Sequence, residues 1–141
     1  MRWLVSVFLA VTGSIWCSLA QAESIPLQSL PGEWHQVVSN AGKCADCKIV
    51  VETSGQDFVV RASNGWSAIV RPSFFQGKTF IAGKGSWEPK VGGVYGGKAF
   101  SLNLGLLNDK LLMLMTVPGP HGQLYNVKAV FEKESASGET F

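Results

Sequence analysis

Two cysteines separated by two residues, Cys44 and Cys47, are the side chains whose spacing most directly suggests chemistry. Such a pair can form a disulfide, exchange thiols, bind a metal or attach a haem. Lys43 and Lys48 flank the pair and could stabilise a thiolate, but the apolar run that begins at Ile49 predicts a strand rather than the helix of a thiol-exchange site. In an oxidising compartment we expect a structural disulfide that makes its loop rigid.

A zinc site would need two more ligands, and His35 and His121 are the two histidines of the sequence. With Cys44 and Cys47 they could make a Cys2His2 set, but their spacing is not that of a zinc finger. Haem attachment usually requires a histidine directly after the second cysteine, where this chain has Lys48. We therefore expect no metal site and no cofactor.

Hydrolytic and phosphate-binding motifs are also missing from the sequence. No Gly-x-Ser-x-Gly turn occurs, and Asp57, Glu88 and Asp109 lie singly near turns without an obvious base partner. The glycine-rich stretch 92–97 lacks the Gly-x-Gly-x-x-Gly spacing and a following helix, so we expect a tight bend or bulge there. The sequence thus predicts no catalytic residues and a protein that is not an enzyme.

The aromatic residues indicate binding more strongly. An eight-stranded barrel is just wide enough either to be filled by its own side chains or to hold one small ligand, and both alternatives stay open here. The residues that we expect to line a ligand site are Trp34, Phe58, Trp66, Phe100 and Tyr125.

The elements that must position these residues are short strands. Turn residues recur at short intervals, and the apolar runs between them alternate with a period of two, while helical periodicity is nowhere sustained. Asn64 and Gly65 suit a two-residue type I′ turn. Eight antiparallel strands that close on themselves leave no edges, so we expect an up-and-down β-barrel, with a β-sandwich as the alternative. The expected strands lie near 32–39, 46–53, 57–63, 66–71, 74–82, 94–104, 110–117 and 123–132.

The run at 110–117 is apolar on both faces, with Leu112 and Leu114 on one of them. One face should be covered by a protein partner, a second copy of the chain or the N-terminal arm at 25–30, and the arm is favoured because it is local and apolar. The face that we expect to form a partner surface comprises Leu111, Met113, Met115 and Val117.

The first 22 residues have the features of a cleavable export signal. Arg2 is followed by the uncharged stretch 3–19 and by the small-residue motif at 20–22, and an uncleaved anchor is the alternative. We therefore expect a periplasmic or secreted protein without a stable membrane anchor. Its parts would be an arm at 23–31, one domain at 32–133 and a polar tail at 134–141.

Removal of the signal changes the cysteine count and the charge. Cys17 leaves with it, so an even pair remains in an oxidising compartment. Eleven basic residues then face ten acids, because Arg2 is one of the twelve Lys and Arg. A net charge near +1 without a basic cluster predicts no nucleic-acid partner.

The triplet Gly32-Glu33-Trp34 resembles the Gly-x-Trp signature of lipocalin-like (calycin) barrels, in which the tryptophan closes one end. The cysteine pair soon after it, the run 95–102 and the turn at 108–109 are together similar to a family of uncharacterised bacterial periplasmic lipocalin-like domains. The resemblance implies the barrel fold. The chain departs from lipocalins in lacking the C-terminal helix and an evident basic partner for the Trp34 ring, for which Arg61 and Arg71 are the candidates.

Two functional hypotheses follow. In the first, the protein is a non-enzymatic barrel that binds a small apolar or amphipathic ligand inside. In the second, it is an interaction module that binds an envelope protein, forms a homodimer or inhibits a hydrolase. The segment 54–58 resembles the Ser-Gly-x-x-Tyr motif of periplasmic lysozyme inhibitors, with Phe58 in place of the tyrosine.

Overall fold

The computed structural model describes residues 27–134, so the expected export signal at 1–22, the beginning of the expected arm and the expected tail beyond Glu134 lie outside the described residues. Eight strands and two short 3-10 turns, η1 (Leu27–Ser29) and η2 (Gly93–Tyr95), make up this range. The strands are β1 (Gly32–Ser39), β2 (Lys48–Ser54), β3 (Asp57–Ala62), β4 (Trp66–Phe75), β5 (Lys78–Trp87), β6 (Ala99–Leu107), β7 (Lys110–Pro118) and β8 (Leu124–Lys133).

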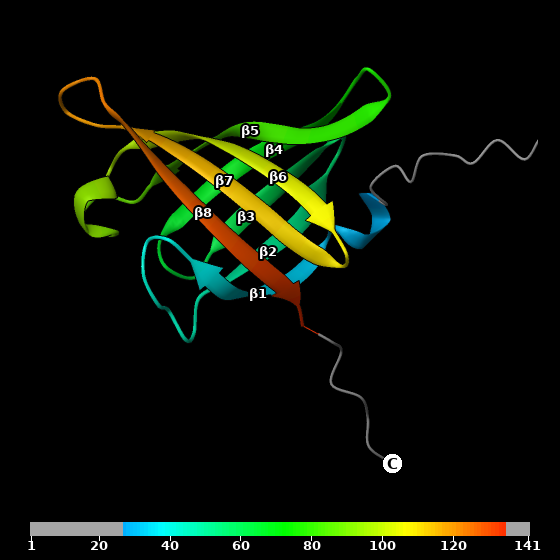
Figure 1. Ribbon diagram of the computed structural model, residues 1–141, viewed down its shortest axis with the longest axis horizontal. Helices are drawn as coiled ribbons and strands as arrows, with labels where there is room; N and C mark the ends of the chain where they lie inside the picture. The colour runs from blue at the N-terminus through cyan, green and yellow to red at the C-terminus, as the bar shows by residue number, and fades with distance from the viewer. Residues whose placement is uncertain (1–26, 135–141) are drawn as a thin grey trace, which may run out of the picture.

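Each strand pairs antiparallel with the next, and β8 returns to pair with β1 (Figure 1). The chain is therefore a closed up-and-down barrel, as the sequence predicts, and not a sandwich. Between residues 27 and 134, no helix is long and apolar enough to cross a membrane.

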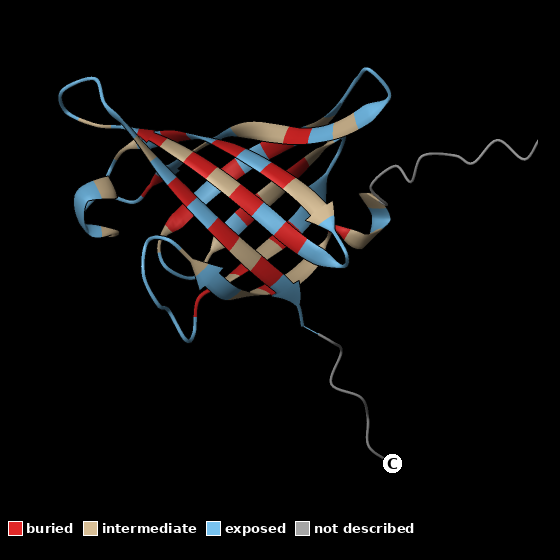
Figure 2. Cartoon of the chain, viewed as in Figure 1, coloured by how far each residue is buried: buried red, intermediate tan, exposed pale blue. Residues whose placement is uncertain are grey.

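The period of two decides which side chains fill the barrel. Buried and exposed residues alternate along the strands (Figure 2). Ile49 and Val51 on β2 share one face and are buried, as are Phe100 and Leu102 on β6. Burial of each large apolar side chain favours folding by roughly 1.5–3 kcal/mol, so this alternation holds the barrel closed.

The tight turns differ in part from the expectation. Gln76 and Gly77 have φ values of 50° and 73°, which gives the two-residue turn with positive φ at both positions. The expected turn of this kind at Asn64 and Gly65 is wrong. Residues 63–65 form a three-residue connection, in which the Gly65 N–H donates to the Ala62 carbonyl and Gly65 alone has positive φ.

The expected strand at 74–82 ends before Gly83 and Gly85, but both glycines lie inside β5. A Cβ at Gly83 would lie 1.9 Å from the Ile69 carbonyl oxygen, and one at Gly85 would lie 2.1 Å from that of Ser67. Glycine is needed here because β4 and β5 approach closely, not because the chain turns. The expected strand at 74–82 is therefore wrong in its bounds, since β4 continues to Phe75 and β5 runs from Lys78 to Trp87.

Trp34 closes one end of the barrel. Its Nε1 donates a hydrogen bond of 2.9 Å to the carbonyl of Leu30, which is fully buried beneath it. The ammonium of Lys133 lies 5.4 Å from the centre of the Trp34 ring and donates to the Ser29 carbonyl at 2.6 Å. The basic partner of the ring is thus Lys133.

The two arginines expected beside Trp34 lie elsewhere. Arg61 pairs with Glu52, and Arg71 pairs with Asp57, in both cases through exposed side chains. The described part of the arm, through Leu27 and Leu30, packs against the core at the Trp34 end. This position differs from the expected cover over one face of the 110–117 strand.

Candidate functional site

The face of β7 that was expected to bind a partner points into the barrel, and its other apolar face points outward. The expected partner surface is buried: its residues are at most 6% exposed and belong to the core, namely Leu111, Met113, Met115 and Val117. That assignment is wrong because the period of two predicts which residues share a face but not which face points inward. The outward apolar residues are Leu112 and Leu114.

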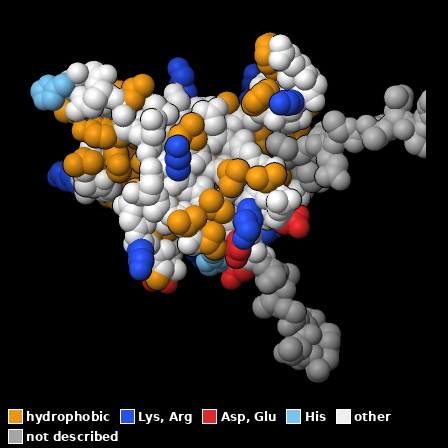
Figure 3. All heavy atoms as spheres, viewed as in Figure 1, with side chains coloured by type: hydrophobic (Ala, Val, Ile, Leu, Met, Phe, Trp, Pro, Cys, Tyr) orange, Lys and Arg blue, Asp and Glu red, His pale blue; other side chains and the backbone are white. Residues whose placement is uncertain are grey.

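Strand register extends this outward surface across four strands. Val38 of β1 lies opposite Val130 of β8, Val130 lies opposite Leu112 of β7, and Leu112 lies opposite Gly105 of β6. Together these residues form an apolar row across the strands. Figure 3 shows hydrophobic side chains gathered on the face that β6, β7 and β8 present to the viewer.

This surface is hollowed into a groove of about 570 Å³, which we call the outer groove. Gly105 forms part of its floor, and a Cβ built there would meet no atom within 4 Å. Val38 is 58% exposed and follows a bulge between β1 and β8, which turns it outward. The groove is lined by Val38, Ser39, Asn40, Asn103, Leu104, Gly105, Leu112, Met113, Leu114, Lys128, Ala129 and Val130.

Polar groups flank the apolar row on one side. Lys128 and Asn103 lie on either side of Leu114 in the strand register. Asn40 fixes the neighbouring backbone, because its Oδ1 accepts from the Lys128 N–H at 2.8 Å and its Nδ2 donates to the Asn126 carbonyl at 3.0 Å. No carboxylate of residues 27–134 forms an ion pair with Lys128, so its ammonium can pair with another anion.

The interior of the barrel holds a smaller cavity, of about 110 Å³, near the end opposite Trp34. Trp66 lines it together with Trp87 and Tyr95, whose rings stack at 5.7 Å. Neither Trp87 nor Tyr95 was among the expected ligand-site residues. Tyr95 was expected to lie in the strand at 94–104, but it lies in η2.

The five aromatic residues expected to bind a ligand do not form one site, although Trp66 and Phe100 are in contact. Trp66 and Phe100 make an edge contact at 5.6 Å within the core, which also buries Phe58. Tyr125 lies half-buried beside Tyr95, with ring centres 6.2 Å apart. Trp34 closes the other end.

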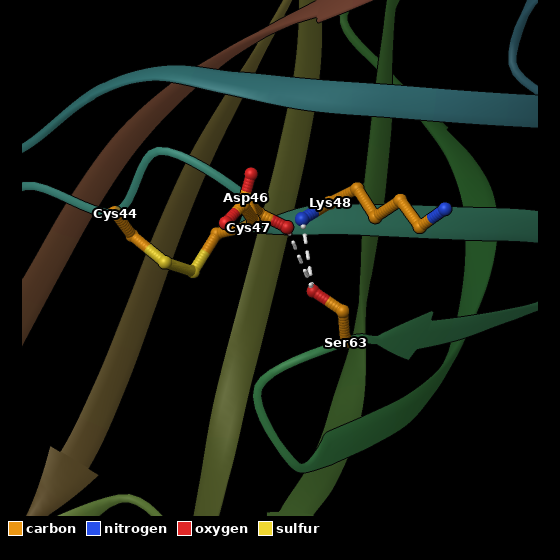
Figure 4. Close-up of a disulfide and its surroundings, with 5 residues drawn as sticks. All are labelled: Cys44, Asp46, Cys47, Lys48 and Ser63. Atoms are coloured by element: carbon orange, nitrogen blue, oxygen red, sulfur yellow. Dashed lines mark hydrogen bonds between the residues drawn. A yellow bond between two sulfur atoms is a disulfide. The ribbon is translucent and has the colours of Figure 1, made fainter.

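The cysteine pair is bonded and its loop is fixed. Cys44 and Cys47 form a disulfide, with Cα atoms 5.3 Å apart, at the edge of the interior cavity (Figure 4). The Ser63 hydroxyl accepts from the Lys48 N–H at 3.0 Å and donates to the Asp46 carbonyl at 3.5 Å. Sulfur atoms joined to each other are not free to act as thiolates or metal ligands, so the expected structural disulfide is confirmed.

The two histidines lie apart from the cysteines. The backbone N–H of His121 donates to the Gln123 side chain in the turn before β8. His35 lies on the outer surface between two carboxylates, those of Glu33 and Glu134. The Cys2His2 set considered from composition is therefore not assembled.

Comparison with known proteins adds no assignment, since neither a family model nor a curated protein matches the chain.

Proposed function

We propose that this protein is an exported, non-enzymatic barrel that binds a small amphipathic ligand in the outer groove. The observation that carries the proposal is the row Val38, Val130, Leu112 and Gly105, above which the groove offers about 570 Å³. Ligand sites usually enclose roughly 300–1,000 Å³, and the interior cavity of about 110 Å³ falls below that range. The proposal thus moves the ligand from inside the barrel to its outer face.

The polar side of the groove supports an acidic end on the ligand. The Lys128 ammonium has no ion-pair partner among the described residues. Asn103 lies opposite Leu114 in the strand register, as Lys128 does on the other side. A molecule with an apolar body and a carboxylate or sulfonate end would cover the apolar row and neutralise this ammonium. Such a charge-assisted contact is stronger than a neutral hydrogen bond.

Fluorescence titration with 1-anilinonaphthalene-8-sulfonate tests the proposal, because this probe joins an apolar body to an anion. Gly105→Leu adds a side chain at the open floor, where a Cβ meets no atom within 4 Å, and we expect it to weaken binding about tenfold, which corresponds to roughly 1.4 kcal/mol. Lys128→Gln should weaken binding severalfold, because it removes the cation.

Ser67→Leu is the matched control, since it adds the same side chain at an exposed position of β4 outside the outer groove. Near-UV circular dichroism verifies that each variant is folded. Equal affinity of Gly105→Leu and the unaltered protein would show that the probe binds elsewhere, and a loss in Trp66→Leu alone would return the ligand to the interior.

A second candidate function, an interaction module, is favoured by a different surface. The β4–β5 hairpin projects beyond the barrel (Figure 1), and it carries Phe74, Phe75 and Phe80 at 72%, 64% and 45% exposure. Exposed aromatic side chains clustered in this way are typical of surfaces that bind another protein.

A further inference from the structure

Strand pairing brings three metal-binding side chains together at the Trp34 end of the barrel. Glu33 and His35 are two residues apart on β1 and therefore share its outward face. The backbone N–H of Glu134, the residue after β8, donates to the Glu33 carbonyl at 3.0 Å. The closure of the barrel thus sets Glu134 beside two residues about 100 positions earlier in the chain.

The ligand atoms of these residues converge. His35 Nε2 lies 2.9 Å from Glu134 Oε2 and 3.4 Å from Glu33 Oε1, and the three atoms lie within 4.8 Å of one another. In a tetrahedral zinc site with bonds of about 2.0–2.2 Å, neighbouring ligand atoms are separated by about 3.4 Å. Shifts of a few tenths of an ångström would place these atoms around one ion.

The environment of the histidine nitrogen also suits a cation. Nε2 of His35 is enclosed by its neighbours and makes no hydrogen bond of acceptable geometry within the described chain. The Glu33 and Glu134 carboxyl groups meet at the β1–β8 seam, where the ligand atoms of the cluster lie within 4.8 Å of one another. A divalent ion between them would take both carboxylates and His35 Nε2 as ligands.

One cation already lies at the edge of this cluster. Lys48 Nζ is 3.0 Å from Glu33 Oε1, and this hydrogen bond lowers the pKa of Glu33 and raises that of Lys48. Lys48 contacts Glu33 and not Glu134, so it competes for one ligand of the three.

We propose that Glu33, His35 and Glu134 form a Zn²⁺ site that joins the two strands closing the barrel. Imidazole and carboxylate ligands match the preference of this ion, and three protein ligands leave a fourth position for water. The site is separate from the outer groove and does not depend on the proposed ligand.

Isothermal titration of the metal-free protein with ZnCl₂ tests the site, and Co²⁺ provides a visible spectrum that reports its coordination. We expect one ion per chain and a tetrahedral Co²⁺ spectrum. His35→Gln and Glu134→Gln should each weaken binding at least tenfold and abolish that spectrum, since each removes one of three ligands. Far-UV circular dichroism confirms that the variants remain folded.

Two further variants separate a specific site from general attraction to an acidic surface. Glu132 lies opposite His35 in the strand register, but its carboxylate pairs with Lys110. Glu132→Gln removes the same charge as Glu134→Gln and should leave the Zn²⁺ affinity within twofold of that of the unaltered protein. Lys48→Gln should bind Zn²⁺ severalfold more tightly, because its competitor is gone. Absence of one-to-one binding, or equal losses in Glu132→Gln and Glu134→Gln, would overturn the proposal.

Discussion

Trp34 shows how a single residue fixes one end of the barrel. Its ring is 2% exposed, its indole N–H satisfies the buried Leu30 carbonyl, and the Lys133 ammonium lies over its face. Three segments, the arm, β1 and the end of β8, therefore meet at one side chain. A buried donor and acceptor that satisfy each other are costly to separate.

We predict that Trp34→Phe lowers the free energy of unfolding by about 1–3 kcal/mol, because the Leu30 carbonyl loses its donor while the core keeps an aromatic ring. Lys133→Met should cost less, about 0.5–1 kcal/mol, because it removes an exposed cation from the ring face. Urea denaturation measures both. A larger loss in Lys133→Met would show that the ammonium, not the indole hydrogen bond, holds this end closed.

Trp34 also shows which contacts a single sequence can predict and which it cannot. The Gly-x-Trp triplet predicted a tryptophan at one end of a barrel, and Trp34 lies there. Its partner Lys133 was missed because 99 positions separate the two, and no local pattern distinguishes one lysine from another. Glu134, which approaches His35 through the same closure, was missed for the same physical reason.

At the scale of the element, alternation predicted the strands well and their bounds less well. Every predicted strand overlaps an observed one, because apolar residues at a period of two can only be buried on one face of a strand. Gly83 and Gly85 were wrongly taken as a break, since glycine serves both tight turns and close strand approach. The sequence also did not predict which face of β7 points inward, because that depends on how the barrel closes.

The β3–β4 pair carries a pH-dependent contact. Arg71 donates two hydrogen bonds to Asp57, at 2.6 and 3.3 Å, and this pairing lowers the pKa of Asp57 below its ordinary value of 3.8. A carboxyl group whose pKa is lower in the folded than in the unfolded state stabilises the fold at pH values above its unfolded-state pKa. That contribution is lost as the pH falls through the folded pKa.

We predict that Asp57→Asn lowers the urea midpoint at pH 7 and that the difference from the unaltered protein shrinks as the pH falls below about 4. The effect should be small, because both side chains contact water and exposed ion pairs contribute little. Denaturation series across this pH range measure it. A difference that stayed constant into acid would assign the effect to the shape of the side chain rather than to its charge.

At the scale of the whole molecule, closure determines how the protein can meet a partner. Pairing of β1 with β8 satisfies both edges of the sheet, so another chain cannot add a strand at this seam. Contacts at the β1–β8 seam must then use side chains on the outer surface. The outer groove and the tip of the β4–β5 hairpin are formed by different strands, and separate substitutions can test them.

If the hairpin is an interaction surface for a second copy of the chain, the protein should self-associate through Phe74, Phe75 and Phe80. Sedimentation velocity between about 10 and 500 µM would then show a rising mean mass, because buried aromatic residues dominate the energy of such contacts. The combined change of the three phenylalanines to serine should leave a monomer at all these concentrations, whereas Gly105→Leu should associate like the unaltered protein. A monomer in the unaltered protein throughout would remove self-association and leave the outer groove as the favoured binding surface.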